Sequence, residues 1–217
     1  ARRLPFVGNK THLIPNGIAP FTALARRAAR ELLAPKAPPE TTLIVTTAEL
    51  TKNKGLPYAL GALALLAREH NLPPFFYTVI GEGELRSVFE KMIAEQHLEK
   101  VARLAGFVPD ASRLLSGADI FLLPSLKEGL PYVLLEAGLL GVPAVATRVG
   151  GASDIIDDMR SGILIRPKRE KEIAEALRFL LREHKKREAF GAALREKVLR
   201  DFSFDKMLAT TLSVYER

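Results

Sequence analysis

The sequence predicts an α/β domain in which helices cover both faces of a parallel, doubly wound sheet. Short apolar runs rich in β-branched and aromatic residues alternate with segments of helical periodicity. The runs are continuous, which is typical of strands buried on both faces, and the segments between them are long enough for parallel crossovers. With 217 residues, 47% of them hydrophobic, the chain suits one large domain with a substantial core.

Strands and helices are predicted in alternation. The strand candidates are residues 42–47, 75–80, 101–107, 119–123, 143–147 and 163–165. The helix candidates are residues 54–69, 84–96, 111–116, 131–140, 153–158, 171–182, 185–200 and 204–215. We therefore expect a doubly wound domain over residues 41–200, followed by a C-terminal helix within residues 201–217.

Residues 1–40 do not follow this alternation. Asn16-Gly17 is typical of a turn, residues 21–33 have a short basic helix pattern, and the prolines of 35–39 indicate a linker. We expect a strap and linker that lead into the domain. Because the first residue is Ala, we expect either a processed chain or a piece of something longer.

Composition excludes several classes of protein. The absence of cysteine excludes disulfide frameworks, thiolate metal sites and cysteine nucleophiles. No apolar run approaches the ~20 residues that span a bilayer, and the first five residues lack the apolar stretch of a secretory signal. We expect a soluble, cytoplasmic protein.

The net charge of +7 is concentrated near the C-terminus. Residues 166–200 hold twelve basic and six acidic side chains, interleaved at helical spacing. This pattern favours a solvated helix face, and peripheral contact with an anionic membrane is the open alternative. We expect no specific nucleic-acid partner.

In an open parallel sheet, ligands bind beyond the carboxyl ends of the strands, so the residues after each strand are informative. After strand 119–123, Gly129-Leu130-Pro131 precedes an apolar helix pattern. Glycine permits close backbone approach, and proline suits a helix start. The free N–H groups of such a helix start suit a phosphate or sugar oxygen.

Two carboxylates frame this element. Glu128 precedes the helix, and Glu136 lies within its apolar sequence, where an ionised carboxylate is costly unless it finds hydrogen-bond donors. Two neighbouring sugar hydroxyls would supply such donors. The alternative is that Glu128 is a solvated acid at the helix start and that Glu136 bonds backbone amides of a nearby turn.

Three further segments follow strands at the same predicted edge. Lys52 and Lys54 come after the first strand and can neutralise a pyrophosphate, although ordinary loop lysines explain them equally. Residues 81–86 begin like a G-x-G-x-x-G motif but lack its third glycine, so a tight turn is favoured. Gly150-Gly151 forms another glycine turn.

The four histidines have no metal-ligand spacing, and no Ser-His-Asp arrangement is recognisable.

In order, IPNG, KG, GEGELR, GFVPD and ADIFLLPSLKEGLPYVLLEAGLLGVPAVATRVGG resemble the C-terminal, donor-binding half of the retaining nucleotide-sugar glycosyltransferases called glycosyl transferases group 1. The resemblance covers about residues 12–216. Its specific part is 119–151, which contains the family's E-x7-E signature as Glu128 and Glu136.

The resemblance implies a Rossmann-like domain, one half of a two-domain GT-B enzyme that needs no metal or other cofactor. It implies that Glu136 holds ribose hydroxyls and that Glu128 is the catalytic-site carboxylate beside the donor sugar. The remaining donor-binding positions would be Lys52, Lys54, Phe107, Val108, Gly129, Leu130, Gly150 and Gly151.

Two departures from the family pattern bear on these expectations. Glu49 stands where the family usually carries an Arg five residues before Lys54, so either Lys52 compensates, Lys54 acts alone, or donor binding is weaker; Glu49 could also pair with Lys54. In addition, the N-terminal acceptor-binding domain is absent from this chain. The helix at 204–215, with Ser203 as its expected N-cap, normally packs toward that domain.

The function that the resemblance implies, and with which these residues agree, is binding of a nucleotide-diphosphate sugar for retaining transfer of a hexose to an acceptor hydroxyl by the full-length enzyme. The isolated chain would bind donor without turnover. The alternatives are a GT-B sugar-nucleotide epimerase or phosphorylase, and a non-catalytic scaffold module with a degenerate donor site and a basic surface. The sequence leaves open the base, the sugar, the acceptor and the oligomeric state.

Overall fold

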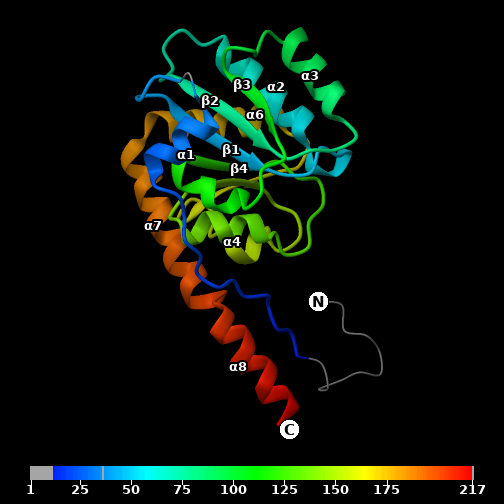
Figure 1. The fold of residues 1–217 in the computed structure, drawn as a ribbon, viewed down its shortest axis with the longest axis vertical. Coiled ribbons are helices and arrows are strands. Elements are labelled where there is room, and N and C mark those ends of the chain that lie inside the picture. Colours follow the sequence, from blue (N-terminus) through cyan, green and yellow to red (C-terminus); the bar gives the residue numbers. More distant parts are fainter. Residues whose placement is uncertain (1–11, 36, 217) are drawn as a thin grey trace.

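The computed structural model describes residues 12–35 and 37–216, so expectations for residues 1–11 lie outside the described part of the chain (Figure 1). Six strands form one sheet in the order β3-β2-β1-β4-β5-β6, and all neighbouring strands are parallel. The strands are β1 (Thr42–Thr47), β2 (Phe75–Ile80), β3 (Ala102–Gly106), β4 (Ile120–Leu123), β5 (Ala144–Thr147) and β6 (Gly162–Ile165). The predicted doubly wound parallel sheet is confirmed, and its order reverses between β1 and β4.

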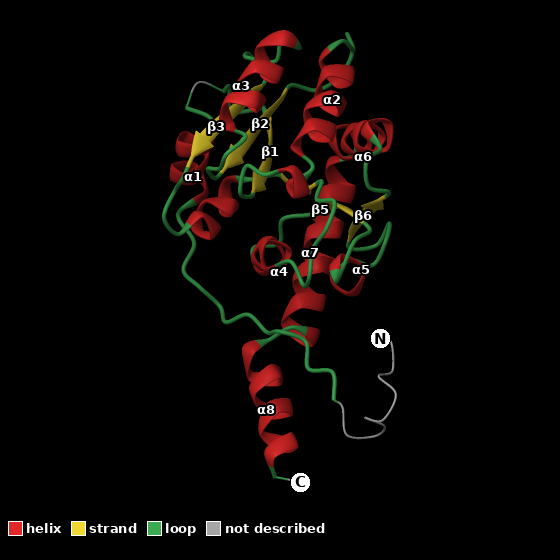
Figure 2. Cartoon of the chain, turned by 90° about the vertical axis from the view of Figure 1, so that its right-hand side faces the viewer, coloured by secondary structure: helices red, strands yellow, loops and turns green. Residues whose placement is uncertain are grey.

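Helices cover both faces of the sheet (Figures 1 and 2). One face carries α2 (Leu56–Ala67), α3 (Arg86–Glu95) and α6 (Glu170–Arg182). The other carries α1 (Arg26–Leu33), the 3-10 helix η3 (Ala111–Gly117), α4 (Tyr132–Leu139), α5 (Ala152–Ile155) and most of α7 (His184–Asp201).

Each strand supplies both layers because successive side chains point to opposite faces. In β1, Ile44 joins the apolar cluster under α2 and α6, and Leu43 and Val45 join the cluster on the α4 face. All three side chains are buried. The continuous apolar run in the sequence therefore corresponds to a central strand covered on both sides.

Two predicted helices differ from the structure by more than two residues at one end, and a third is broken near its start. The pattern at 54–69 is broken at Gly55, where φ is +65°, into a 3-10 turn η2 (Lys52–Lys54) and α2. A Cβ at Gly55 would lie 2.0 Å from the Pro124 carbonyl oxygen, so only glycine fits there. The basic helix predicted at 21–33 begins at Arg26, and the one predicted at 153–158 is the four-residue α5.

The N-terminal strap contacts the chain where the last helix, α8 (Phe204–Tyr215), begins. Ile18 exchanges backbone hydrogen bonds with Phe202 and Phe204 at 2.8 and 3.1 Å. Ser203 caps α8 by accepting a hydrogen bond from the Lys206 N–H, as predicted. The helix extends away from the sheet, and none of its residues is buried (Figures 1 and 2).

Candidate functional site

Backbone hydrogen bonds join the loops that follow the strands into one surface at the carboxyl edge of the sheet. The loop after β1 bonds the loop after β2 through Leu50 N–H and the Glu82 carbonyl, and Gly81 N–H reaches Gly106 at the end of β3. On the other side, Leu126 N–H after β4 donates to the Asn53 carbonyl at 2.7 Å. The segments singled out by the sequence therefore do lie along one edge.

The junction between the loops after β1 and β4 brings Lys54 and Glu128 together. Lys54 Nζ lies 2.8 Å from Glu128 Oε1, and their side chains are 27% and 13% exposed. Ser125 Oγ donates to the same carboxylate oxygen at 2.7 Å. The Glu128 carboxylate is therefore bound by two side chains and is largely inaccessible to solvent. The interpretation of Glu128 as a solvated acid is wrong.

Glu49 does not pair with Lys54, which corrects one of the expectations. Glu49 is exposed and makes no ion pair with any residue in the described ranges. The Lys54 ammonium instead pairs with Glu128. Lys52, two residues before Lys54, is exposed and likewise lacks a carboxylate partner among the described residues.

Ser125 and Thr147 are two site residues that the sequence analysis did not assign. Ser125 is fully buried and orients Glu128 through its hydroxyl, and its own carbonyl accepts a short hydrogen bond from Thr147 Oγ1 at the end of β5. Both residues carry hydroxyls at the carboxyl end of an apolar strand, and that position was the signal available in the sequence.

The segment before α4 presents unused backbone donors. The N–H groups of Gly129 and Leu130 have no acceptor within the described part of the chain, and a Cβ at Gly129 would meet no atom within 4 Å. Pro131 occupies the N-cap position, and α4 begins one residue later than predicted. The backbone here is open to an approaching ligand.

The glycine turn after β5 packs under that segment. Gly150 has a φ of +51°, and a Cβ on it would lie 2.2 Å from the Glu128 carbonyl oxygen. Gly151 N–H donates to the Gly129 carbonyl at 2.6 Å. These two glycines therefore support the backbone of Glu128 and Gly129 through close packing.

Glu136 lies in the second turn of α4 and is half-buried. Its carboxylate makes no hydrogen bond or ion pair with any described residue, so the alternative that it bonds nearby amides is wrong. Burial raises the pKa of the Glu136 carboxyl above its usual value. A carboxylate in this state lacks hydrogen-bond donors that a ligand can supply.

Phe107 and Val108 follow β3 at the same edge. Phe107 is 73% exposed, and Val108 packs partly against the core on the α4 face. The turn at 81–86, held by an ion pair between Arg86 and Glu82, borders the same edge.

The described part of the chain also has a sizeable hollow away from this edge. A cavity of about 630 Å³ sits at the amino edge, between the linker at 34–38 and residues 72–76, and is lined mainly by apolar side chains. Cavity size alone therefore does not identify the polar site at the carboxyl edge.

No group of three or more metal-ligating side chains occurs among residues 12–35 and 37–216. Within the same residues, no helix has the length and apolarity to cross a lipid bilayer.

Comparison with known proteins shows which family the chain belongs to. The chain is 39% identical over 129 residues to the amylovoran biosynthesis glycosyltransferase AmsK of Erwinia amylovora, covering 56% of this chain and 31% of that protein. It is 30% identical to the D-inositol 3-phosphate glycosyltransferase of Jonesia denitrificans, covering 96% and 51%. The chain thus spans about half the length, or less, of these relatives.

Solved structures share the fold. A sucrose-phosphate synthase from Thermosynechococcus elongatus superimposes with a TM-score of 0.83 at 21% identity, covering 95% of this chain and 52% of that one. The C-terminal domain of a glycosyl transferase group 1 protein (LpcC) from Francisella tularensis gives 0.71 at 24%, covering 84% and 95%. The family model for glycosyl transferases group 1 matches residues 30–197, and the chain therefore belongs to that family.

Proposed function

We propose that the carboxyl edge of this domain binds a nucleotide-diphosphate sugar as donor for retaining transfer of a hexose to an acceptor hydroxyl. The observation that carries the proposal is the half-buried Glu136 carboxylate, which has no donor within the described chain. Two ribose hydroxyls would supply the missing hydrogen bonds and offset the cost of burying the charge.

The remaining groups suit the other parts of such a donor. The free N–H groups of Gly129 and Leu130 suit the diphosphate or sugar oxygens. Phe107 and Val108 would lie beside the base, and Gly150 and Gly151 would keep the backbone close to the ligand. Lys52 and Lys54 would face the negative charge of the diphosphate.

The pair formed by Lys54 and Glu128 fits the charge changes of glycosyl transfer. As the bond to the sugar breaks, negative charge accumulates on the leaving diphosphate and positive charge develops on the sugar ring. Lys54, turned from Glu128 to the diphosphate, would stabilise the first, and Glu128 beside the reacting carbon would stabilise the second. Ser125 would hold Glu128 in place during this exchange.

The rest of the active site would come from an N-terminal acceptor-binding domain outside this chain. The curated relatives are about twice as long or longer. On α8, Phe204, Leu208, Leu212 and Tyr215 recur along one side of the helix and are all exposed. We propose that this apolar side packs against that domain, and that the isolated chain binds donor but transfers little or nothing.

Calorimetry with UDP, GDP and ADP and their sugars tests the proposal. UDP is the first probe because the Anabaena protein HepE, which shares this fold with a TM-score of 0.78, has been solved with UDP and glucose. We expect one nucleotide series to bind, and Glu136→Ala to weaken it at least about tenfold. The exposed Glu99→Ala, at the opposite edge, is the matched control and should leave binding unchanged.

One observation favours a second candidate, a scaffold module with a degenerate donor site. Glu49 adds negative charge near the diphosphate position, and Lys54 is already paired. This candidate gains support if no nucleotide binds while the chain sediments with anionic vesicles in a salt-sensitive manner.

A further inference from the structure

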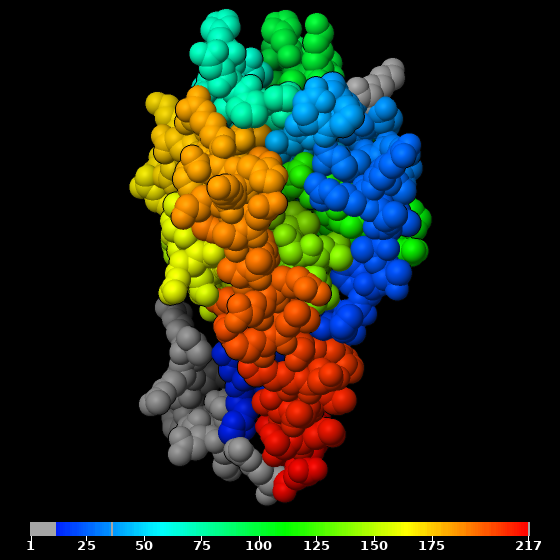
Figure 3. All heavy atoms as spheres, turned by 90° about the vertical axis from the view of Figure 1, so that its left-hand side faces the viewer, coloured from blue at the N-terminus to red at the C-terminus, as the bar shows by residue number. Residues whose placement is uncertain are grey.

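A polar hollow of about 340 Å³ lies at the amino edge of the sheet, opposite the candidate donor site. Its charged and titratable lining comes from Arg26 on α1, Asp119 before β4, and His184, Arg187 and Glu188 on α7. In Figure 3 the blue atoms of α1 and the orange atoms of α7 flank green atoms of the segments between them. The hollow is separate from every residue assigned above to the donor.

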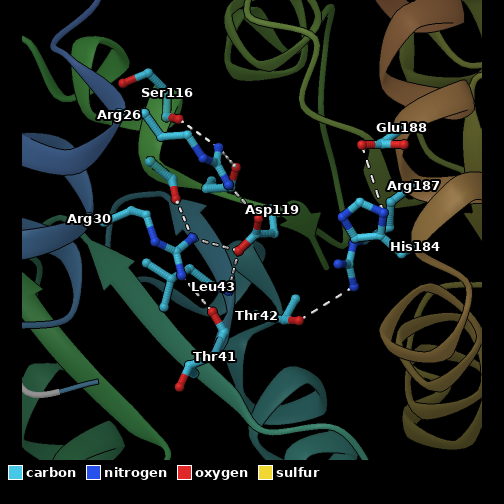
Figure 4. Close-up of polar contacts among 12 residues, drawn as sticks. Arg26, Arg30, Thr41, Thr42, Leu43, Ser116, Asp119, His184, Arg187 and Glu188 are labelled. Atoms are coloured by element: carbon cyan, nitrogen blue, oxygen red, sulfur yellow. Dashed lines mark hydrogen bonds and ion pairs between the residues drawn. The ribbon is translucent and has the colours of Figure 1, made fainter. Parts of the chain in front are cut away.

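Arg187 is the notable group in this hollow because most of its hydrogen-bonding capacity is unused. Its Nη1 donates to the Leu180 carbonyl at 2.9 Å and lies 3.4 Å from Thr42 Oγ1 (Figure 4). Its Nε and Nη2 have no acceptor among residues 12–35 and 37–216. Three N–H bonds of a half-buried guanidinium are therefore left without a protein partner.

The obvious carboxylate partner is already occupied. Asp119 Oδ1 accepts from Arg26 at 2.5 Å, and Oδ2 accepts from Arg30 at 2.7 Å and from Leu43 N–H at 2.8 Å (Figure 4). Both oxygens thus serve to hold α1 and β1 against the start of β4. Asp119 contributes attraction at a distance to Arg187 but no hydrogen bond.

The charge balance of the hollow and its surroundings is positive. Arg26, Arg30 and Arg187 face two carboxylates, Asp119 and Glu188, and Glu188 lies 3.7 Å from His184 Nδ1. Burial lowers the pKa of Arg187, and Asp119 counters part of that effect. An arginine nevertheless keeps its proton at neutral pH, so one positive charge remains without a paired anion.

A guanidinium with a free Nε–H and Nη2–H edge matches the two oxygens of a phosphoryl group in a bidentate arrangement. We propose that the hollow between α1 and α7 is a binding site for a phosphate monoester group, with Arg187 supplying the bidentate contact and His184 and Arg26 lining it. The group could be carried by a small phosphorylated molecule or by a lipid headgroup, and both present the same chemistry.

The test is calorimetric titration of the 217-residue chain with inorganic phosphate. We expect saturable binding that Arg187→Gln weakens at least about tenfold and that Arg187→Lys, which keeps charge but loses the fork, weakens less. Lys186→Gln removes an adjacent exposed charge and should leave binding unchanged. Equal loss in Lys186→Gln, or wild-type binding by Arg187→Gln, would overturn the proposal.

A second comparison keeps the two sites apart. Phosphate binding in the hollow should persist in Lys54→Gln, and nucleotide binding should persist in Arg187→Gln. If Arg187→Gln fails to fold, as judged by circular dichroism, Arg187→Lys decides: phosphate binding equal to that of the wild type overturns the bidentate assignment.

Vesicles distinguish the two sources of the phosphoryl group. Phosphatidylcholine vesicles containing phosphatidic acid, a monoester, are compared with vesicles containing phosphatidylglycerol, a diester. Sedimentation with the first alone, lost in Arg187→Gln, identifies a lipid headgroup. Binding of free phosphate without vesicle binding identifies a soluble phosphorylated ligand. Arg187-independent binding to both vesicle types, without phosphate binding, contradicts the proposal.

Discussion

Lys54 and Glu128 form an ion pair of 2.8 Å that spans the β1 and β4 loops at the point where the strand order reverses. Each group also has a separate role in the proposed function, so the pair must open when a donor binds. The ion pair therefore competes with the diphosphate for Lys54.

This competition predicts opposite effects of two neutral substitutions. Glu128→Gln should free Lys54 and strengthen binding of the nucleoside diphosphate severalfold, while the extra affinity conferred by the sugar falls. Lys54→Gln should lower the affinity for the nucleoside diphosphate about tenfold, because a charge-assisted contact is lost. Calorimetry of both ligands on both variants measures these changes. Lys100→Gln, at the amino edge, is the control, and weaker diphosphate binding by Glu128→Gln would contradict the competition.

The half-buried position of Glu136 predicts that replacing it with the neutral Gln stabilises the folded protein, and that this gain depends on pH. Because the folded state raises its pKa above the usual 4.5, folding disfavours the carboxylate. The stability associated with its protonated form is fully present below the unfolded pKa and is lost as pH rises through the folded pKa. Because the carboxyl is only half-buried, solvent screening reduces this effect, and Glu136→Gln should raise Tm at pH 7 by about 1–2 °C.

Thermal melts over a range of pH check this prediction for Glu136. The advantage of Glu136→Gln should shrink on acidification. It should level off below about pH 4.5, where the Glu136 carboxyl is protonated in both the folded and the unfolded protein. Glu49→Gln, at an exposed position, should show no such pattern. An advantage independent of pH would show that packing, and not the buried charge, separates the two proteins.

Alanine substitutions at Gly150 and Gly129 should have different effects: the first should lower stability, and the second should lower nucleotide affinity. Gly150→Ala places a Cβ against the Glu128 carbonyl oxygen at a φ of +51°, so we expect a loss of about 1–3 kcal/mol and a clearly lower Tm. Gly129→Ala meets no neighbouring atom and should melt like the wild type. Its methyl would occupy the space beside the free N–H groups, so nucleotide affinity should fall about tenfold.

Calorimetry and thermal melts on the same two preparations check the prediction. Unchanged nucleotide affinity in a stable Gly129→Ala protein would remove the backbone of Gly129 from the binding site, whatever the outcome for Gly150→Ala.

The sheet was predictable because its signal is local. The apolar runs of β1 and β2 carry continuous β-branched and aromatic residues, and parallel strands buried on both faces require such runs. The break at Gly55 had a local signal, because Gly55-Leu56-Pro57 repeats the Gly-Leu-Pro pattern that indicates a helix start at Gly129-Leu130-Pro131. The contact that requires glycine there was not predictable, because it is made with Pro124, 69 positions along the chain.

For the candidate site, the edge of the sheet at which the residues lie was predictable from the sequence, and the contacts between them were not. The rule that ligands bind at the carboxyl edge, with the E-x7-E signature, identified Glu128 and Glu136. It did not show that Lys54 pairs with Glu128, because Glu49 is nearer in sequence and of the same charge. Ser125 went unassigned because a buried serine after a strand is recognised as a positioning group only when its acceptor is known.

Glu49 predicts that the donor site can be strengthened by a single substitution. It is exposed just beyond the carboxyl end of β1 and forms no ion pair with the described residues. In the proposed site, its carboxylate would repel the diphosphate. Glu49→Arg reverses the charge at the position where the family usually carries arginine, and should tighten nucleoside diphosphate binding about fivefold at low salt. Glu49→Gln should give part of that gain, and added salt should reduce both. Glu99→Arg makes the same charge change at the opposite edge and should have no effect. If Glu49→Arg and Glu99→Arg raise affinity equally in calorimetry, the gain comes from net charge, and residue 49 does not face the diphosphate.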